Sequence, residues 1–514
     1  MSSRKDCDMN NGKTEGIMEK TELTARLEQA RQYERQHQTA AQERPAFHVT
    51  APVGWINDPN GFSLFQGEYH LFYQYHPYSS LWGPMHWGHC KTKDFIRWTW
   101  LPCALAPDEA YDGQGCFSGS AVEQDGKHLL MYTGVREREK EDGTKEVFQT
   151  QCMAVGDGTD YVKLQENPVI LADSLPEGSS AADFRDPKIW REDGRFYAVI
   201  GSLDGDGSGQ IALFSSADGT GWSFESILDR NQGRYGKMWE CPDFFTLDSR
   251  QVLIVSPQFM RAEGLEFHNG NNSIYFVGSY EKEKKCFLRK EARQIDYGLD
   301  FYAPQTLETA DGRRIMIAWM KSWDNDLTPE GAGWSGMMTV PRELRLDGER
   351  LIQNPVRELE TYRRNEVRHA VRLTREDGEK ALDGISGRVL DMTVELKAGD
   401  YEVFQIALAA DSDSRTLLVY DRKRATLTTD RTWSGLRKDQ VCVRSAAVRE
   451  REGKLKLRIV MDRFSAEVFV NDGETAMSTV IHTDQKAQGI FFSCDGTAEI
   501  SVVKYDLEAE GLTF

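Results

Sequence analysis

Three acidic residues stand in short motifs that could carry out acid–base chemistry. Asp58 lies in GWINDPNG, Asp186 in FRDPK and Glu240 in KMWECPDFF. Pro, Asn and Gly favour turns, so a surface turn is the simpler interpretation of Asp58 taken alone. Three carboxylates held close together would instead suit glycoside hydrolysis, in which one ionised carboxylate is the nucleophile and one protonated carboxyl is the general acid. The arrangement of the elements around them decides between the two interpretations.

A strand-like run recurs along the middle of the chain. Its five copies are GEYHLFYQY from Gly67, GKHLLMYTG from Gly126, GRFYAVIGS from Gly194, RQVLIVSPQ from Arg250 and GRRIMIAWM from Gly312. The starts of these runs lie 59, 68, 56 and 62 residues apart. A turn followed by a strand at this period predicts a β-propeller with one blade per repeat.

Five polar residues, among them the three acids, occupy matching places in that repeat. The residues concerned stand 8 to 10 positions before the runs, and they are Asp58, Ser118, Asp186, Glu240 and Tyr302. Equivalent positions in successive blades are related by rotation about the propeller axis. We therefore expect these side chains to converge at one end of the central channel.

The neighbours of Glu240 favour a protonated carboxyl. Met238, Trp239 and Pro242 are apolar, and burial together with repulsion from two aspartates would hold Glu240 protonated near neutral pH, as a general acid requires. On spacing alone, a glutamate bonded to a backbone amide at a strand end fits equally well.

Asp186 also has a simpler interpretation. Arg185 and Lys188 flank it, so a salt-bridged turn would account for FRDPK if that motif stood alone. Two Asp-Pro turns and a glutamate at matched repeat positions are harder to explain in this way.

The two ends of the chain differ from the repeat in their pattern of apolar residues. Residues 1–44 are expected to form an N-terminal extension with one amphipathic helix, because Leu23, Leu27, Ala30 and Tyr33 recur at helical spacing between residues 20 and 42. Residues 45–345 are expected to form a five-bladed propeller as the catalytic domain.

The C-terminal part is predicted to be a separate β-domain. Residues 346–365 are charged and contain Pro355, which indicates a linker, and residues 366–514 contain alternating stretches such as KLKLRIVMD and SAEVFVNDGE, which indicate a β-sandwich. The predicted fold class is all-β: a five-bladed β-propeller followed by a C-terminal β-sandwich, with a short N-terminal helix.

Composition excludes several kinds of partner. The formal net charge of −18 argues against nucleic acid, which needs a basic surface. Neither a signal peptide nor a membrane-spanning stretch is visible, so we expect a cytoplasmic protein without a membrane partner. Nine cysteines without a C-x-x-C pair, and histidines without zinc spacing, predict no metal. No cofactor motif is found.

Six motifs, in order, resemble those of family 32 of the glycoside hydrolases, the β-fructofuranosidases, which include invertases, sucrose-6-phosphate hydrolases and fructan exohydrolases. These motifs are WINDPNG, QYHPYSSLWGPMHWGH, CFSGS, FRDPK, WECPD and DYGLDFYAPQT. The resemblance extends over about residues 45–360 and, more weakly, over the tail, where RFSAEVFVNDGE is similar to the family's sandwich.

The resemblance implies a role for each matching residue. Asp58 matches the nucleophile, Glu240 the acid/base, and Asp186 the transition-state stabiliser that binds hydroxyls of the fructosyl ring. Cys241 matches a position thought in the family to influence the pKa of the acid/base. The residues that match the fructose subsite are Asn57, Gln74, Trp82, Phe117, Ser118, Arg185 and Asp296.

The expected activity is retaining hydrolysis of terminal β-D-fructofuranosides (sucrose, sucrose 6-phosphate or short fructo-oligosaccharides) by double displacement, with a small-molecule sugar as partner. Fructosyl transfer to a sugar acceptor and a non-catalytic, glycan-binding propeller are the alternatives. The sequence leaves the leaving group open, although a phosphorylated one would favour a basic rim, and four cations lie near the motifs: Arg230, Arg234, Lys237 and Lys321. The sandwich offers a surface through which two chains could form a homo-oligomer.

Overall fold

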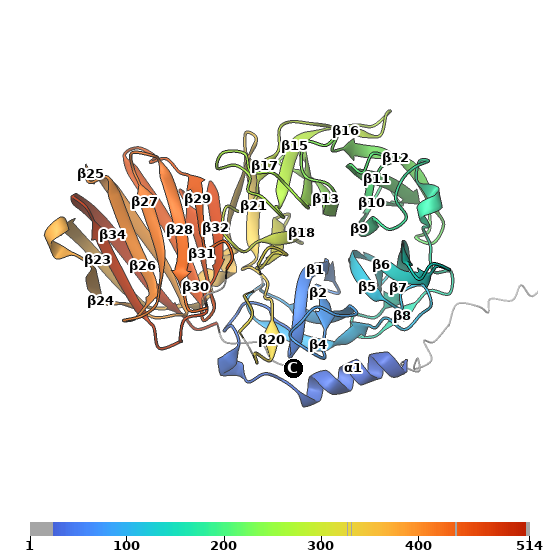
Figure 1. The fold of residues 1–514 in the computed structure, drawn as a ribbon, viewed down its shortest axis with the longest axis horizontal. Helices are drawn as coiled ribbons and strands as arrows, with labels where there is room; N and C mark the ends of the chain where they lie inside the picture. Colours follow the sequence, from blue (N-terminus) through green and yellow to red (C-terminus); the bar gives the residue numbers. More distant parts are fainter. Residues whose placement is uncertain (1–23, 326, 330, 437–438, 510–514) are drawn as a thin grey trace, which may run out of the picture.

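The computed structural model describes residues 24–325, 327–329, 331–436 and 439–509. Figure 1 shows a ring of small sheets beside a stack of two larger sheets, with one helix running along the outside of the ring. Leu23, which belongs to the predicted helical pattern, and most of the predicted N-terminal extension lie outside the described residues.

The ring consists of five sheets that follow one another along the chain. The first contains β1 (Gly54–Phe65), β2 (Glu68–His76), β3 (His86–Thr92) and β4 (Trp98–Leu105), with β20 (Trp334–Ser335) at its β1 edge. The second contains β5 (Gly115–Gln124), β6 (Lys127–Glu139), β7 (Lys145–Gly156) and β8 (Tyr161–Lys163). The third contains β9 (Phe184–Glu192), β10 (Arg195–Leu203), β11 (Gly209–Ser216) and β12 (Trp222–Arg230).

The last two sheets complete the ring. The fourth contains β13 (Trp239–Leu247), β14 (Arg250–Pro257), β15 (Ile274–Glu281) and β16 (Cys286–Arg289), with β17 (Arg293–Gln294) paired to β15. The fifth contains β18 (Tyr302–Glu308), β19 (Arg314–Trp319), β21 (Arg342–Asp347) and β22 (Arg350–Pro355). The five predicted runs are β2, β6, β10, β14 and β19, so each forms the second strand of its sheet, and the predicted propeller is confirmed.

The short strand β20 fastens the end of the ring to its beginning. It lies between β19 and β21 in the sequence but pairs in parallel with β1, where Gly54 and Trp55 oppose Trp334 and Ser335. The first sheet, which carries Asp58, is therefore held in place by a segment that comes from the fifth repeat.

The predicted linker over residues 346–365 is wrong for much of its length. Residues 350–355 form β22, which pairs along its whole length with β21, and Leu351 and Ile352 are buried. Most charged residues of the predicted linker lie on either side of this strand, in which Leu351, Ile352 and Gln353 are buried in succession. The connection to the next unit is limited to the short 3₁₀ turn η3 (Arg357–Tyr362).

The predicted sandwich is confirmed as two six-stranded sheets. One has the order β23 (Arg363–Thr374), β34 (Thr497–Leu507), β25 (Leu390–Asp400), β30 (Lys454–Asp462), β31 (Ser465–Val470), β32 (Thr475–Val480). The other has the order β24 (Lys380–Ser386), β33 (Gly489–Cys494), β26 (Val403–Ala410), β27 (Arg415–Asp421), β28 (Thr426–Trp433), β29 (Val443–Ala447). Their inward-facing residues, such as Leu396, Ile406 and Phe492, form one apolar core.

The N-terminal helix α1 (Ala25–Gln36) is shorter than the pattern over residues 20–42 predicts. Thr24 caps its start by accepting a hydrogen bond from the amide of Leu27, and Leu27 and Ala30 are buried. Three further 3₁₀ turns are η1 (Ala41–Glu43), η2 (Ala172–Ser174) and η4 (Arg375–Asp377). Among the described residues, no helix is long and apolar enough to cross a membrane.

A buried network of charges joins the propeller to the sandwich. His48 lies between two sandwich carboxylates, with Nδ1 2.8 Å from Asp462 Oδ2 and Nε2 2.9 Å from Glu467 Oε1. Arg342 donates to Glu467 at 2.6 Å and to Asp296 at 2.9 Å. All five side chains are 0% exposed. Burial alone would lower the pKa of His48, but its hydrogen bonds to the carboxylates of Asp462 and Glu467 raise it to about 9.

Because His48 is charged in the folded protein, we expect the protein to be less stable at alkaline pH. Its folded pKa lies above the ordinary 6.5, so its stabilisation is complete below pH 6.5 and is lost as the pH rises through about 9. Replacing His48 by Gln should lower the free energy of unfolding by about 3–5 kcal/mol near pH 6, because it leaves the buried carboxylate of Asp462 without its cation. Above pH 9 the difference from the wild type should shrink. Urea unfolding at the two pH values measures both.

The matched control for this prediction is His37→Gln, which replaces an exposed histidine at the end of α1. It should change stability little at either pH. An equal loss for His48→Gln at both pH values would mean that His48 is neutral in the folded protein, contrary to the expectation.

Candidate active site

The strand that begins each sheet of the ring carries a β-bulge at the predicted site position. In β1, Asn57 and Asp58 together oppose the single residue Gln74, because Ile56 pairs with Tyr75 and Pro59 with Tyr73. The corresponding irregularities in the other four sheets fall at Ser118, at Asp186 and Pro187, at Cys241 and Pro242, and at Ala303 and Pro304. A bulge turns side chains out of the regular alternation of a strand. The repeat thus aims one side chain or more from every sheet at a shared place.

Three of the bulges hold a non-glycine residue in the left-handed region. The backbone φ is +66° at Asp186, +48° at Cys241 and +52° at Ala303. Such conformations cost about 1–3 kcal/mol each for residues with a side chain and persist where the surrounding structure imposes them. Their occurrence at one matched position indicates that the backbone there is shaped for a purpose other than stability.

The carboxylates of Asp58 and Asp186 meet at Cys241. Its Sγ lies 3.6 Å from Asp58 Oδ2 and 3.6 Å from Asp186 Oδ2, and its backbone amide donates to Asp186 Oδ2 at 3.0 Å. Ser118 Oγ donates to Asp58 Oδ2 at 2.6 Å. Asp58 Oδ1 is buried and makes no hydrogen bond in the described part of the chain. This oxygen is therefore an unpartnered acceptor inside the acid cluster.

Placing these acids together makes ionisation costly. Burial raises the pKa of Asp58, the charge of Glu240 raises it further, and the hydrogen bond from Ser118 opposes both. Burial raises the pKa of Asp186 to about 7, against the opposing charge of Arg185. A substrate that develops positive charge between them would relieve this cost.

Glu240 is held by two polar side chains. Arg185 Nε donates to Oε1 at 3.0 Å, and the Tyr302 hydroxyl donates to Oε2 at 2.6 Å. Met238 and Trp239 are buried, and Trp239 belongs to an apolar core. The sequence predicted apolar surroundings for the Glu240 carboxyl, but its direct neighbours are polar. The orientation of Glu240 is fixed by Arg185 and Tyr302.

The simple salt-bridged turn does not account for Asp186. Arg185 pairs with Glu240 and with Asp183 at 3.2 Å, while Lys188 Nζ lies 3.1 Å from Asp243. The cations that flank Asp186 are thus engaged by other carboxylates, which leaves Asp186 facing Cys241.

Most of the other predicted subsite residues surround this cluster. Asn57 is buried and accepts a hydrogen bond from Trp55 Nε1 at 2.9 Å, and Gln74 is buried and donates to the carbonyl of Cys116 at 3.0 Å. Trp82 is 49% exposed, and its ring meets that of Phe117 edge to face at 6.2 Å. Phe117 immediately precedes Ser118, so this aromatic pair lies next to the acids.

Asp296 differs from these residues in its partners, and its place in the sugar subsite stays a prediction. Both of its oxygens are engaged in the buried network between propeller and sandwich, where Oδ2 binds Arg342 and Oδ1 accepts from the amides of Gly298 and Ser478. Asp296 is 1% exposed. Its charge is neutralised by an arginine that lies 46 residues further along the chain, which a motif cannot reveal.

Tyr302 was placed among the converging positions but was assigned no role, and Trp55 and Trp323 were not singled out. Tyr302 holds Glu240, and its position in the fifth repeat was the signal that could have assigned it. Trp55, which contacts Asn57, stacks on Trp323 at 6.2 Å, and Trp323 is 41% exposed. No group of three or more His, Cys, Asp or Glu residues within the described ranges is arranged to hold a metal ion.

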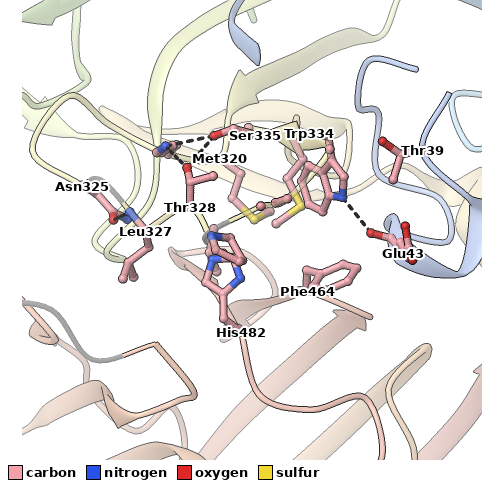
Figure 2. Close-up of a pocket in the computed structure, with 18 residues that line it drawn as sticks. Thr39, Glu43, Met320, Asn325, Leu327, Thr328, Trp334, Ser335, Phe464 and His482 are labelled. Carbon is pink, nitrogen blue, oxygen red and sulfur yellow. Dashed lines mark hydrogen bonds between the residues drawn. The ribbon is translucent and has the colours of Figure 1, made fainter. Parts of the chain in front are cut away.

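A separate cavity lies where the N-terminal segment, the ring and the sandwich meet (Figure 2). It has about 890 Å³ of empty space, open solvent included. Lys321 Nζ donates there to Thr328 Oγ1 at 3.0 Å and to Ser335 Oγ at 3.2 Å, and Trp334 donates to the carbonyl of Glu43. None of the predicted site residues lines it, so it is distinct from the acid cluster.

Comparison with known proteins gives consistent matches along the chain. The profile of the glycosyl hydrolases family 32 N-terminal domain matches residues 48–355, and that of the family's C-terminal domain matches residues 358–508. A sucrose-6-phosphate hydrolase of Zymomonas mobilis is 38% identical and covers 88% of this chain and 90% of its own. A raffinose invertase of Escherichia coli is 37% identical, covering 85% and 89%.

Solved structures agree with the sequence matches. A Bombyx mori GH32 β-fructofuranosidase superimposes with a TM-score of 0.81 at 33% identity, covering 94% of this chain and 97% of its own. A sucrose-6-phosphate hydrolase from Lactobacillus gasseri superimposes with a TM-score of 0.80 at 27% identity, covering 94% of this chain and 97% of its own. Both alignments include the ring and the sandwich.

Proposed function

We propose, from the premise that this chain belongs to family 32 of the glycosyl hydrolases, that it releases fructose from terminal β-D-fructofuranosides by a retaining, two-step hydrolysis. The substrates we expect are sucrose, sucrose 6-phosphate or short fructo-oligosaccharides. The names of the relatives, sucrose-6-phosphate hydrolase and raffinose invertase, support this class of substrate.

One observation carries the proposal: Asp58 and Asp186 share Cys241 as a neighbour, and Glu240 immediately precedes Cys241 in the chain. A pair of carboxyl groups flanking the scissile bond is what glycosidases use. A protein that only bound glycans would gain nothing from acids whose burial, and then whose proximity to other acids, raises the pKa of Asp58 and Asp186.

In the first step, Asp58 Oδ1 attacks the anomeric C2 of the fructosyl unit while Glu240 protonates the departing oxygen. The bond from C2 to the leaving sugar breaks and a bond from C2 to Asp58 forms. Asp186 binds ring hydroxyls and stabilises the positive charge that develops on the sugar. Ser118 holds the second oxygen of Asp58, which fixes the direction of attack.

In the second step, Glu240, now ionised, removes a proton from water, and the resulting hydroxide displaces Asp58 from C2. Two inversions at C2 give net retention. Arg185 and Tyr302 keep Glu240 in place throughout, because one donates to each of its oxygens.

The test is fructose release from sucrose, sucrose 6-phosphate and 1-kestose, with the first-formed anomer followed by NMR. We expect β-fructose to appear first. Release of the α-anomer first would exclude double displacement, and no fructose from any of the three would overturn the proposal. Oligosaccharides formed at high sucrose would instead indicate fructosyl transfer.

We further propose a cytoplasmic location, supported by the eight described cysteines, all of which are free. Association of two chains through the sandwich stays a prediction, as do the predicted domain boundaries other than the corrected linker.

A further inference from the structure

A basic cavity opens beside the two strands that hold Glu240. It has about 1030 Å³ of empty space, open solvent included, and its lining includes Arg234, Lys237 and Arg261. Asp206 is the carboxylate among its lining residues, and Phe259, which is 65% exposed, forms part of its wall. The chain has a formal net charge of −18, so three cations around one cavity form a local excess of positive charge.

Residues that line the cavity stand next to the strands of the site. Glu240 pairs with Ser256, and Trp239 pairs with Pro257. Beyond this ladder, the amide of Gln258 donates to the carbonyl of Met238 at 3.0 Å and the amide of Lys237 donates to the carbonyl of Gln258 at 2.8 Å. Lys237 stands three residues before Glu240, a span of about 10 Å in an extended chain.

The cations differ in how far they are already neutralised. Arg234 pairs with Glu291 at 2.6 Å, and both side chains are largely exposed. The Lys237 ammonium lies 5.5 Å from the centre of the Phe259 ring, and within the described residues it forms no ion pair. The Arg261 side chain has neither an ion pair nor a hydrogen bond to another described residue. Lys237 and Arg261 therefore have unused capacity to bind an anion.

The wall that carries these cations is fixed in place. Asn231 is 0% exposed, donates to the carbonyl of Gly236 at 2.8 Å and accepts from the amide of Tyr235 at 2.6 Å. The amide of Gly233 donates to Ser208 Oγ at 2.8 Å. Segment 231–237 is thus tied to itself and to the hairpin between β10 and β11, so that a bound anion meets a wall that is already formed.

We propose that this cavity binds the phosphate of a leaving sugar that carries a phosphate ester, as in sucrose 6-phosphate; this inference rests on the proposed function. The oxygen that Glu240 protonates belongs to the leaving sugar, so that sugar must extend from Glu240, and Lys237 of the cavity stands three residues from Glu240. A phosphate ester has a charge of about −1.5 to −2 at pH 7. Guanidinium groups bind its oxygens in a fork, and an ammonium binds it as a point charge.

The test compares kcat/KM for sucrose 6-phosphate and for sucrose in the wild type and in the double variant Lys237→Gln/Arg261→Gln. We expect the wild type to prefer the phosphorylated substrate by tenfold or more, and the double variant to lose at least tenfold of that preference. The preference of the wild type should also fall as ionic strength rises, because salt screens exposed charges.

The matched control is Lys127→Gln/Arg191→Gln. It also removes one lysine and one arginine, here from exposed positions outside the cavity. Arg191, like Lys237, lies over an aromatic ring. It should leave the preference at the wild-type value. Thermal unfolding of both double variants checks that they are folded, which we expect because all four side chains are exposed.

A second measurement tests the leaving sugar directly. Glucose 6-phosphate should inhibit the wild type more strongly than glucose or inorganic phosphate does, and the double variant should lose this difference. Equal inhibition by inorganic phosphate and glucose 6-phosphate would mean a general anion site and would overturn the assignment to the leaving sugar.

The possible failures are distinguishable. Equal rates on the two substrates in the wild type, or an undiminished preference in the double variant, would overturn the phosphate subsite and leave the proposed hydrolysis standing. Fructose from neither substrate would overturn the proposed function and the subsite with it.

Discussion

Replacing Asp58 by Asn is expected to lower kcat for fructose release by on the order of 10⁴-fold, the scale of loss when a covalent nucleophile is removed. Asn keeps the size and can still accept the hydrogen bond from Ser118, but it cannot form the ester with C2. The loss of kcat would therefore come from the missing covalent step and not from a change in the shape of the site. Initial rates on sucrose at saturating concentration measure it.

The same variant should be more stable than the wild type at alkaline pH. Burial raises the pKa of Asp58 above 3.8, so its ionised form costs stability once the pH exceeds the raised value. Asn has no charge to bury. The unfolding temperature of Asp58→Asn should exceed that of the wild type near pH 8, and the difference should vanish as the pH falls toward 3.8.

Two further variants make this prediction decisive. Asp58→Ala, which cannot revert by deamidation, should be equally inactive. Asp125→Asn changes an exposed aspartate in the turn before β6, where φ is +52° and Asn is well tolerated, and should keep both activity and stability. Wild-type turnover in Asp58→Ala would rule out Asp58 as the nucleophile.

Replacing Glu240 by Gln should lower kcat/KM on sucrose by about 10²–10⁴-fold, because the leaving sugar then departs without a proton. Gln can still donate or accept a hydrogen bond with Tyr302 but cannot transfer a proton. An aryl fructoside, whose phenol leaves readily without protonation, should lose much less in the first step. The measurement is the ratio of the two losses, with a burst of phenol expected as the fructosyl enzyme accumulates.

The control for Glu240 is Glu192→Gln, at the end of β9, where the carboxylate is exposed and outside the acid cluster. Its rates on both substrates should match the wild type. If Glu240→Gln lost the same factor on sucrose and on the aryl fructoside, Glu240 would not be the group that protonates the leaving oxygen.

Much of the fold could be predicted because its signals are local. The strand that follows each turn has the same apolar character in all five repeats, and every one of those runs became the second strand of a sheet. The positions of Asp58, Asp186 and Glu240 relative to these strands therefore placed them at equivalent points of a ring. The segment that contains β22 was predicted as a linker because charged residues surround the short apolar run of this strand.

The partners of each site residue were beyond the reach of sequence patterns. Cys241 contacts Asp58 across 183 residues, and Tyr302 contacts Glu240 across 62. Asp296 belongs to a motif that also matched the site, yet Arg342 and Ser478 engage it in the buried network beneath the sandwich. Which carboxylate faces a substrate and which faces an arginine depends on the packing of distant segments.

The sequence by itself determined the ring of strands, the sandwich and the repeat positions of the three acids, because periodicity and turn residues act over a few neighbours. The tertiary structure alone decided that Arg185 and Tyr302 hold Glu240, that Arg342 binds Asp296, and that Lys237 and Arg261 border one cavity. The physical reason is that charge and hydrogen bonding act through space, between groups that the fold brings together from separate blades.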